Sequence, residues 1–261
     1  MRIDLASAPG DPERPNEDWL SAALPACGQG GVLVALDGVT PPAGEDGCVH
    51  GVPWFTARLG GRLTELSGSR RDMSLDRILA EAIRDTAAAH GDGCDLSHVR
   101  TPQATVVVAR WDEEYVEHLV LSDSVLLLQS PAGEVTAVRD DRLDRVPREV
   151  LRSHAATDAL RNAYGRADAF FTAAADPAAA GLAVTGRTPR AQVRALAALT
   201  DGAGRWTETF REGDWADCMA VLRKEGAEGL IARVRTLESD PARPSGRGKR
   251  HDDASAAYAE L

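Results

Sequence analysis

Apolar residues along the chain fall into short continuous runs and into helical repeats, which predicts a mixture of strands and helices. The run Gly31–Leu36, GVLVAL, is continuous and contains β-branched residues, as is typical of a strand. Between residues 75 and 90, apolar side chains recur every three or four positions, which predicts a helix. Ser74 is a suitable N-cap for this helix, and Gly91 is a suitable stop.

Further runs extend this pattern. Strands are predicted at residues 53–59, 104–111, 115–121, 125–129, 134–138, 169–175, 193–200 and 254–259, and helices at residues 148–164, 214–224 and 227–237. The runs between residues 104 and 138 are separated by short turns, which predicts an antiparallel meander. Strands come early and late with helices between them, so the pattern favours a layered α+β fold over regular βαβ alternation.

The chain shows no internal repeat and no break in composition, so we expect a single domain over residues 1–261. One segment stands apart. Residues 240–250 combine proline, glycine and arginine with almost no apolar side chain, which predicts a mobile loop around residues 240–250.

Charge and hydropathy exclude several classes of partner. Thirty basic and 40 acidic residues give a net charge of −10, and binding of nucleic acid needs a basic face. No apolar run reaches the ~18 residues of a membrane span. The first residues include acids and form no apolar signal segment, so we expect a cytoplasmic protein.

Cysteines and histidines give no familiar metal-binding pattern in the sequence. The cysteines are widely separated without a CxxC pair, which predicts independent reduced thiols at Cys27, Cys48, Cys94 and Cys218. The histidines show no paired metal spacing; they are His50, His90, His98, His118, His154 and His251. His251, beside Asp252, is read as a solvated loop residue, with reach to a nearby site as the alternative.

Acidic residues recur where predicted apolar strands begin or end. These positions are Glu17-Asp18, Asp37-Gly38, Asp201-Gly202 and Asp252-Asp253. Carboxylates that converge on one rim of a sheet repel one another unless divalent cations lie between them, and Mg²⁺ and Mn²⁺ prefer such oxygen ligands. The alternative is ordinary turn chemistry, since Asp-Gly is a common turn dipeptide. Spacing alone leaves both interpretations open.

The order of several short motifs resembles that of the metal-dependent protein phosphatases of the PP2C family. The motifs are NED at residues 16–18, VALDG at 34–38, ATVVVA at 104–109, LSDSVLLL at 121–128, ALTDGAGRW at 198–206 and HDDAS at 251–255. The resemblance covers nearly the whole chain and is nearest to compact actinobacterial members. It implies a sandwich of two antiparallel β-sheets flanked by helices, with a two-metal centre at one edge.

The same resemblance implies the ligands of two Mn²⁺ or Mg²⁺ ions. Asp37 matches the aspartate that bridges both metals, and Gly38 matches the residue that lends its backbone carbonyl. Asp201 and Asp252 match two further ligands. The implied reaction is attack on phosphorus by a metal-activated water, in line with the leaving oxygen.

Other positions carry supporting roles in the family. Glu17 and Asp18 match an acidic pair that holds metal-bound water, and Asp123 matches an aspartate tied to a third, weaker metal. Arg14 is the candidate for the arginine that binds the phosphate, although it lies three residues before Glu17 where the family has four.

Three positions depart from the common family pattern. Val39 stands where many members have a histidine that is proposed to protonate the leaving group. Arg205 stands where an aspartate is often found, which predicts a weak or missing third metal site, and Asp253 replaces the commoner asparagine. The implied ligands of the two main metals are all present.

These observations favour a monomeric bacterial Mg²⁺- or Mn²⁺-dependent serine/threonine phosphatase, acting on phosphorylated proteins and not on nucleic acid or membranes. Two alternatives remain open at this point. One is a phosphatase for a small phosphorylated metabolite, and the other is a catalytically silent domain that binds a kinase or a phosphoprotein.

Overall fold

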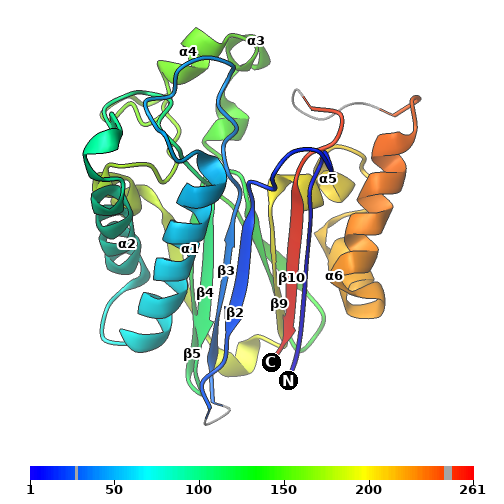
Figure 1. Ribbon diagram of the computed structural model, residues 1–261. Helices are drawn as coiled ribbons and strands as arrows, with labels where there is room; N and C mark the ends of the chain where they lie inside the picture. Colours follow the sequence, from blue (N-terminus) through cyan, green and yellow to red (C-terminus); the bar gives the residue numbers. More distant parts are fainter. Residues whose placement is uncertain (27–28, 244–248) are drawn as a thin grey trace.

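Two five-stranded antiparallel sheets stack face to face, with helices on both outer faces (Figure 1). The computed structural model describes residues 1–26, 29–243 and 249–261. The arrangement confirms the predicted α+β fold, a sandwich of two antiparallel β-sheets flanked by helices.

The first sheet and its helices form one half of the sandwich. Its strand order is β2 (Trp19–Ala23), β3 (Gly31–Leu36), β4 (Val106–Trp111), β5 (Tyr115–Leu121) and β8 (Val184–Pro189). The helices α1 (Val52–Ser69) and α2 (Leu75–Ala89) cover its outer face (Figure 1).

The second sheet forms the other half. Its order is β1 (Arg2–Ala8), β10 (Ala254–Glu260), β9 (Ala195–Leu199), β6 (Val125–Gln129) and β7 (Val135–Val138), covered by α5 (Asp201–Glu208) and α6 (Trp215–Ser239). The shorter helices are α3 (Arg148–Leu151), α4 (His154–Asp158), η1 (Gly91–Gly93), η2 (Leu143–Arg145), η3 (Pro177–Leu182) and η4 (Arg190–Gln192).

The apolar core lies in three layers, and β3 shows why its sequence is continuously apolar. Val34 and Leu36 pack against the helices of the first half, whereas Leu33 and Ala35 pack between the two sheets. A strand buried on both faces needs apolar side chains on both sides of the pleat. The predicted strand therefore matches β3 at both ends.

The strand predicted at residues 53–59 is wrong, because this segment begins helix α1. Its apolar residues Phe55 and Leu59 continue at helical spacing to Leu63, and all three are buried. Gly60 and Gly61 follow the predicted strand and resemble a strand end, but Gly60 lies within the helix against Trp19. A Cβ atom at Gly60 would lie 2.1 Å from the Trp19 ring, so the glycine permits close packing of α1 on β2.

The predicted meander over residues 104–138 is also wrong in its connection. The pairs β4–β5 and β6–β7 are antiparallel as expected, but they belong to different sheets. The chain crosses between the sheets at Ser122, whose φ of 69° lies in the left-handed region. Asp140 stabilises this crossover by accepting a hydrogen bond of 2.9 Å from the Ser122 backbone N–H.

Other differences are local. The helix predicted at residues 148–164 is broken into α3 and α4, and residues 169–175 form isolated bridges instead of a strand. The two helices predicted after residue 214 are joined in α6 with a kink at Gly226, whose φ is 79°. Strands β1, β2 and β8 contain no fully buried residue and no continuous apolar run, and the sequence pattern did not indicate them.

The predicted mobility of residues 240–250 stays a prediction, since residues 244–248 lie outside the described residues. Within the described part of that segment, Arg243 forms an ion pair of 2.7 Å with Glu212. The single-domain organisation likewise stays a prediction.

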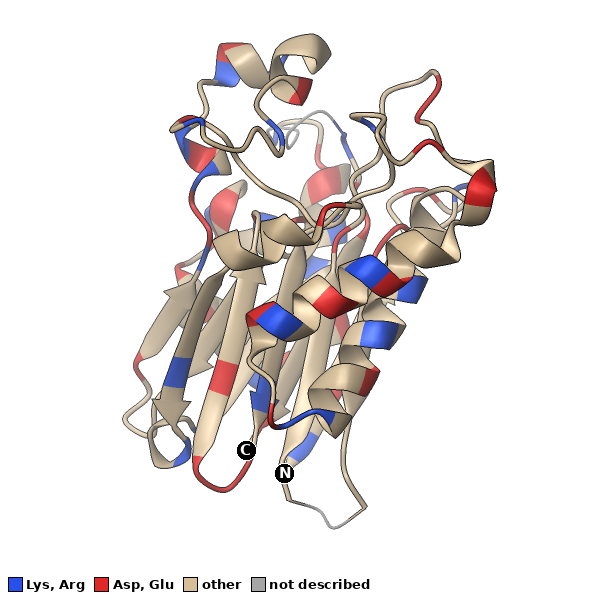
Figure 2. Ribbon diagram, turned by 90° about the vertical axis from the view of Figure 1, so that its left-hand side faces the viewer, with Lys and Arg blue, Asp and Glu red and all other residues tan. Residues whose placement is uncertain are grey.

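Charged residues of both signs interleave on the outer helices of the first half, at the front of Figure 2. Arg62 on α1 pairs with Asp85 on α2 at 2.6 Å, so these charges join the two helices. In the described part of the chain, no helix combines the length and apolar character needed to cross a membrane.

One end of the sandwich collects the strand termini that carry the predicted acidic residues. Strands β1, β3 and β9 end there, while β2 and β10 begin there, at the upper end of Figure 1. Antiparallel pairing of β1 with β10 and of β2 with β3 therefore brings distant parts of the sequence together.

Candidate metal centre

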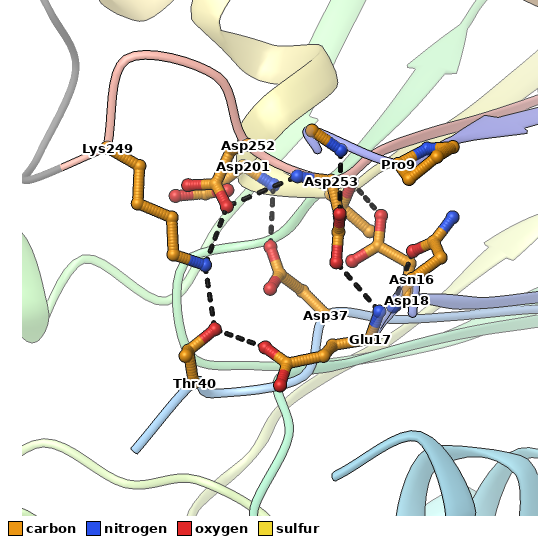
Figure 3. A network of polar contacts seen from close by, with 12 residues as sticks. Pro9, Asn16, Glu17, Asp18, Asp37, Thr40, Asp201, Lys249, Asp252 and Asp253 are labelled. Carbon is orange, nitrogen blue, oxygen red and sulfur yellow. Dashed lines mark hydrogen bonds and ion pairs between the residues drawn. The ribbon is translucent and has the colours of Figure 1, made fainter. Parts of the chain in front are cut away.

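The acidic residues predicted from the sequence converge at this end of the sandwich (Figure 3). Asp37 follows β3, Asp201 begins α5, and Asp252 precedes β10. The Asp201 backbone N–H donates a hydrogen bond of 3.2 Å to Asp37 Oδ2. Glu17 and Asp18, just before β2, complete the group.

The backbone on both sides of Asp37 is held by the neighbouring strand. The Asp37 N–H donates to Thr105 Oγ1 at 3.2 Å, and the Thr105 N–H donates to the Asp37 carbonyl at 2.9 Å. At the next position, a Cβ atom on Gly38 would lie 2.4 Å from Val52 Cγ1 and 2.5 Å from the Glu17 carbonyl. Glycine is therefore required at residue 38 for close approach of the chain segments around the centre.

Asp253 ties two segments of the centre together. Its Oδ1 accepts a hydrogen bond of 2.8 Å from the Gly10 N–H, and its Oδ2 accepts one of 2.7 Å from the Glu17 N–H. Both oxygens are thus engaged by backbone donors. This residue, which departs from the asparagine common in the family, positions the loop that carries Glu17.

Asp18 offers an acceptor without a donor. Thr200 Oγ1 donates to Asp18 Oδ2 at 3.0 Å, but the buried Oδ1 has no hydrogen-bond partner among the described residues. Removal from water raises the pKa of Asp18 to about 8, despite the opposing effect of the nearby Ser255 and Thr200 hydroxyl groups. An acceptor in this environment favours a proton or a cation at Oδ1.

The carboxylates at the centre of the group destabilise one another's charged forms. Removal from water and the nearby carboxylates of Asp201 and Asp18 raise the pKa of Asp37 well above its ordinary value. The pKa of Asp201 is also raised, first by removal from water and then by Asp252. Such a set of hard oxygen donors fits Mg²⁺ or Mn²⁺, whose charge would offset the repulsion.

Two cationic side chains already contact Asp252, and sequence reasoning missed this arrangement. Arg205 donates to Asp252 Oδ2 at 2.7 Å, and Lys249 Nζ donates to Asp252 Oδ1 at 3.0 Å (Figure 3 shows the lysine). Arg205 is buried and also pairs with Glu238 at 2.7 Å. In the sequence, only the arginine at residue 205, where the family often has an aspartate, pointed to these contacts with Asp252. Lys249 lies in the segment that was interpreted as a mobile loop.

A pocket opens beside the carboxylates. Its lining includes Arg14, Glu17, Thr40, Lys249, His251 and Asp252. Lys249 Nζ donates to Thr40 Oγ1 at 2.7 Å, and the Thr40 hydroxyl donates to Glu17 (Figure 3). The pocket therefore combines cationic groups with the edge of the acidic cluster. Arg14 lies where it faces this pocket, and His251 also lines it while pairing with Glu238 at 3.2 Å.

Asp123 and Val39 are the two remaining positions that the family resemblance singled out. Asp123 lines a second pocket with Asp201 and Arg205, and its charge contributes to the raised pKa of Asp37. Val39 directly follows Gly38, and its N–H donates to the Gln103 carbonyl at 2.9 Å. The predicted residues are thus gathered at one end of the fold, and their roles as ligands stay predictions.

The prediction of independent thiols is wrong for Cys48 and Cys94, whose Sγ atoms are 3.5 Å apart. His50 and His90 converge on the same point, an arrangement that the spacing of histidines in the sequence did not indicate. Cys218 is buried in α6, and Cys27 lies outside the described residues. The four converging residues come from two loops that are far apart in the sequence.

Comparisons with known proteins agree with the geometry at the level of the fold. Neither protein-family models nor curated protein sequences gave a match. Solved structures did. The serine/threonine phosphatase Stp1 from Staphylococcus aureus aligns with a TM-score of 0.59 and 13% identity, over 100% of this chain and 95% of that one.

Two further structures are similar to the same extent. The Mycobacterium tuberculosis serine/threonine phosphatase PstP/Ppp aligns with a TM-score of 0.58 and 15% identity, over 100% of this chain and 98% of that one. The serine-threonine phosphatase 2C from Toxoplasma gondii gives a TM-score of 0.58 and 16% identity, over 98% and 93% of the two chains. From end to end, the chain has the fold of the PP2C serine/threonine phosphatases.

Proposed function

We propose that this protein is a Mg²⁺- or Mn²⁺-dependent phosphomonoesterase that acts on phosphoserine and phosphothreonine in proteins. The observation that carries the proposal is the convergence of Asp18, Asp37 and Asp201, whose pKa values are all raised. Carboxylates that repel one another and leave a buried oxygen without a donor are stabilised by divalent cations. The phosphatase fold supplies the reaction class.

Under this proposal, Asp37, the Gly38 carbonyl and Asp201 would hold two cations, with Asp252 as a further ligand. Divalent cations at this position would lower the pKa of a bound water and neutralise charge on the phosphoryl group. Asp253 keeps Glu17 in place through the Glu17 N–H. Glu17 and Asp18 would accept hydrogen bonds from water at the edge of the centre.

Arg14 would bind the phosphate of the substrate. It lines the pocket beside the carboxylates, and a guanidinium can contact two phosphate oxygens at once. Lys249 and Thr40 face the same pocket and supply further donors for the phosphate. The choice of phosphoproteins as the substrate class rests on the similarity of the fold to serine/threonine phosphatases.

The proposal is tested by hydrolysis of an aryl phosphate and of a phosphothreonine peptide by the purified protein. We expect activity that is absent in EDTA and is restored by Mn²⁺ or Mg²⁺. Release of inorganic phosphate is measured over a range of metal concentrations. Hydrolysis that persists unchanged in EDTA, or no hydrolysis with either metal, would contradict the proposal.

A second candidate function is a catalytically silent domain that binds a phosphorylated partner. The observation in its favour is that Arg205 and Lys249 engage both oxygens of Asp252. Cationic side chains in this position take over part of the charge compensation that a metal would provide. In that case Arg14 and Lys249 would serve as phosphate-binding groups without turnover.

The variant Lys249→Ala separates the two candidates. Removing the ammonium frees Asp252 Oδ1, so we expect affinity for Mn²⁺, measured by calorimetry without substrate, to rise about fivefold, a modest change because Lys249 is partly exposed. Lys224→Ala removes the same charge from the exposed side of α6 and is the matched control. Under the silent alternative, the unsubstituted protein shows no Mn²⁺ binding and Lys249→Ala acquires it. Weaker Mn²⁺ binding in Lys249→Ala would contradict both interpretations of this contact.

A further inference from the structure

A group of thiols and imidazoles lies outside the acidic centre and takes no part in the proposed reaction. We call it the Cys/His cluster; it consists of Cys48, His50, His90 and Cys94. One potential ligand atom from each residue lies within 4.8 Å of all the others. His90 is buried and the other three residues are half-buried, so the cluster is partly accessible to solvent.

Four of the six distances between ligand atoms in the cluster match the edges of a metal-centred tetrahedron, and the other two lie within 4.8 Å. Zinc–sulfur bonds of about 2.3 Å and zinc–nitrogen bonds of about 2.0–2.1 Å place tetrahedral ligand atoms about 3.3–3.8 Å apart. The two sulfur atoms are 3.5 Å apart. Cys48 Sγ lies 3.8 Å from His50 Nδ1 and 3.5 Å from His90 Nδ1, and Cys94 Sγ lies 3.3 Å from His50 Nδ1.

Surrounding groups hold the ligand atoms in these positions. The His50 backbone N–H donates to Cys48 Sγ at 3.3 Å, a contact that stabilises a thiolate. Trp54 stacks on the His50 ring with centroids 4.1 Å apart, and it meets His90 edge-on at 4.6 Å. The ring planes are thereby fixed by packing, as is expected for ligands that are preorganised for a metal.

The two loops that supply the cluster are also joined by their backbones. The Asp95 N–H donates to the Gly47 carbonyl at 2.7 Å, and Gly47 has a φ of 79°. A Cβ atom at Gly47 would lie 2.6 Å from the Asp95 carbonyl, so this close approach requires glycine. Contact between the loops is therefore built into the fold and not limited to the side chains.

We propose that the Cys/His cluster binds one structural Zn²⁺ ion. Two sulfur and two nitrogen ligands in tetrahedral geometry suit zinc, whereas Mg²⁺ and Mn²⁺ prefer the oxygen ligands of the acidic centre. Four protein ligands leave no open position for water or substrate, so the site is structural and not catalytic. Zinc binding converts the two thiols to thiolates and releases their protons.

The position of the cluster shows what the zinc ion would stabilise. Cys48 and His50 precede α1, and His90 and Cys94 follow α2, so the ion would tie the start of one helix to the end of the next. Residues 39–51 connect Gly38 of the acidic centre directly to α1. Zinc would thus anchor the far end of the loop that leaves the acidic centre. This inference does not depend on the proposed function.

Metal analysis of the purified, reduced protein tests the proposal. The protein is treated with EDTA and gel-filtered, then loaded with zinc and gel-filtered again. We expect it to retain about one equivalent of Zn²⁺ per chain. In Cys48→Ser and Cys94→Ser, the retained zinc should fall below about a tenth of an equivalent. Cys218→Ala and His154→Ala are the matched controls and retain zinc. Asp37→Asn also retains it, which separates this site from the acidic centre. Cobalt bound at the site is expected to show the visible absorption of tetrahedral coordination with thiolate charge transfer.

A second measurement covers the case in which the cysteine variants fail to fold. In the unsubstituted protein, zinc is expected to slow alkylation of Cys48 and Cys94 by iodoacetamide, which is followed by peptide mass mapping. No retained zinc with both thiols reactive would overturn the proposal. A Cys48–Cys94 disulfide that persists under reducing conditions, or an octahedral cobalt spectrum, would overturn it equally.

Discussion

Asp37→Asn is expected to lower kcat/KM for an aryl phosphate by at least about 10³-fold. Loss of a residue that only hydrogen-bonds to a metal ligand typically costs about 10–100-fold, so a larger loss is expected for a ligand itself. The proposed role of Asp37 is to contact both cations, so an amide in its place weakens both sites at once. Asp201→Asn is expected to act in the same direction. The measurement is steady-state hydrolysis at saturating Mn²⁺, together with calorimetric titration of Mn²⁺ in the absence of substrate.

The same substitution is not expected to damage the fold. Because the folded state raises the pKa of Asp37, the stability contributed by protonation of this carboxyl is fully present below its unfolded pKa and is lost as pH rises through the folded pKa. Asn cannot ionise, so it replaces a group whose charged form the fold disfavours, and the free energy of unfolding in EDTA near neutral pH should equal or exceed that of the unsubstituted protein. Asp72→Asn, which alters an exposed pair with Arg70, is the control. Near-normal activity with unchanged Mn²⁺ affinity in Asp37→Asn would show that the site assignment is wrong.

The elements that could be predicted from the sequence are those whose burial leaves a local pattern. Strand β3 is apolar throughout because it packs on both faces, and α2 repeats its buried residues at helical spacing. Edge strand β1 lacks such a pattern, since none of its side chains is fully buried. Helix α1 was misread because Gly60 and Gly61 look like a strand end, although Gly60 serves the contact with Trp19.

The acidic centre was open to prediction because several motifs keep a fixed order along the chain. Each Asp-Gly pair alone was ambiguous, and at Asp201 the pair begins α5 instead of forming a turn. The role of Lys249 was not open to prediction, because its contact with Asp252 depends on the conformation of residues 249–252 and on the placement of Thr40, which leave no sequence pattern.

The Cys/His cluster was missed for a related reason. Its ligands come in a Cys-x-His pair and a His-x3-Cys pair, separated by the whole of α1 and α2. A search limited to CxxC spacing overlooks such mixed pairs. The packing of α1 against α2 brings the two pairs together. This packing could not be anticipated, because the sequence pattern did not reveal that α1 is a helix.

The unsubstituted protein is expected to hydrolyse an aryl phosphate more efficiently than a phosphothreonine peptide, by roughly the 10²–10⁴-fold that general acid catalysis contributes. Val39 stands directly after Gly38, at a position where it offers no proton to the leaving group. An aryl oxide leaves with little protonation, whereas the alkoxide of threonine is far more basic. The missing acid therefore slows the alkyl substrate more than the aryl one.

Val39→His is expected to narrow this difference by raising kcat/KM for the peptide while leaving the aryl phosphate nearly unchanged. Val39→Leu keeps the apolar character of the position and is the control, in which the difference should persist. The backbone at residue 39 is held by the Gln103 carbonyl, so both substitutions leave the loop anchored. Equal efficiency on the two substrates in the unsubstituted protein would mean that another group already supplies the proton. His251 lines the same pocket, and loss of peptide hydrolysis alone in His251→Ala would then identify it as that acid.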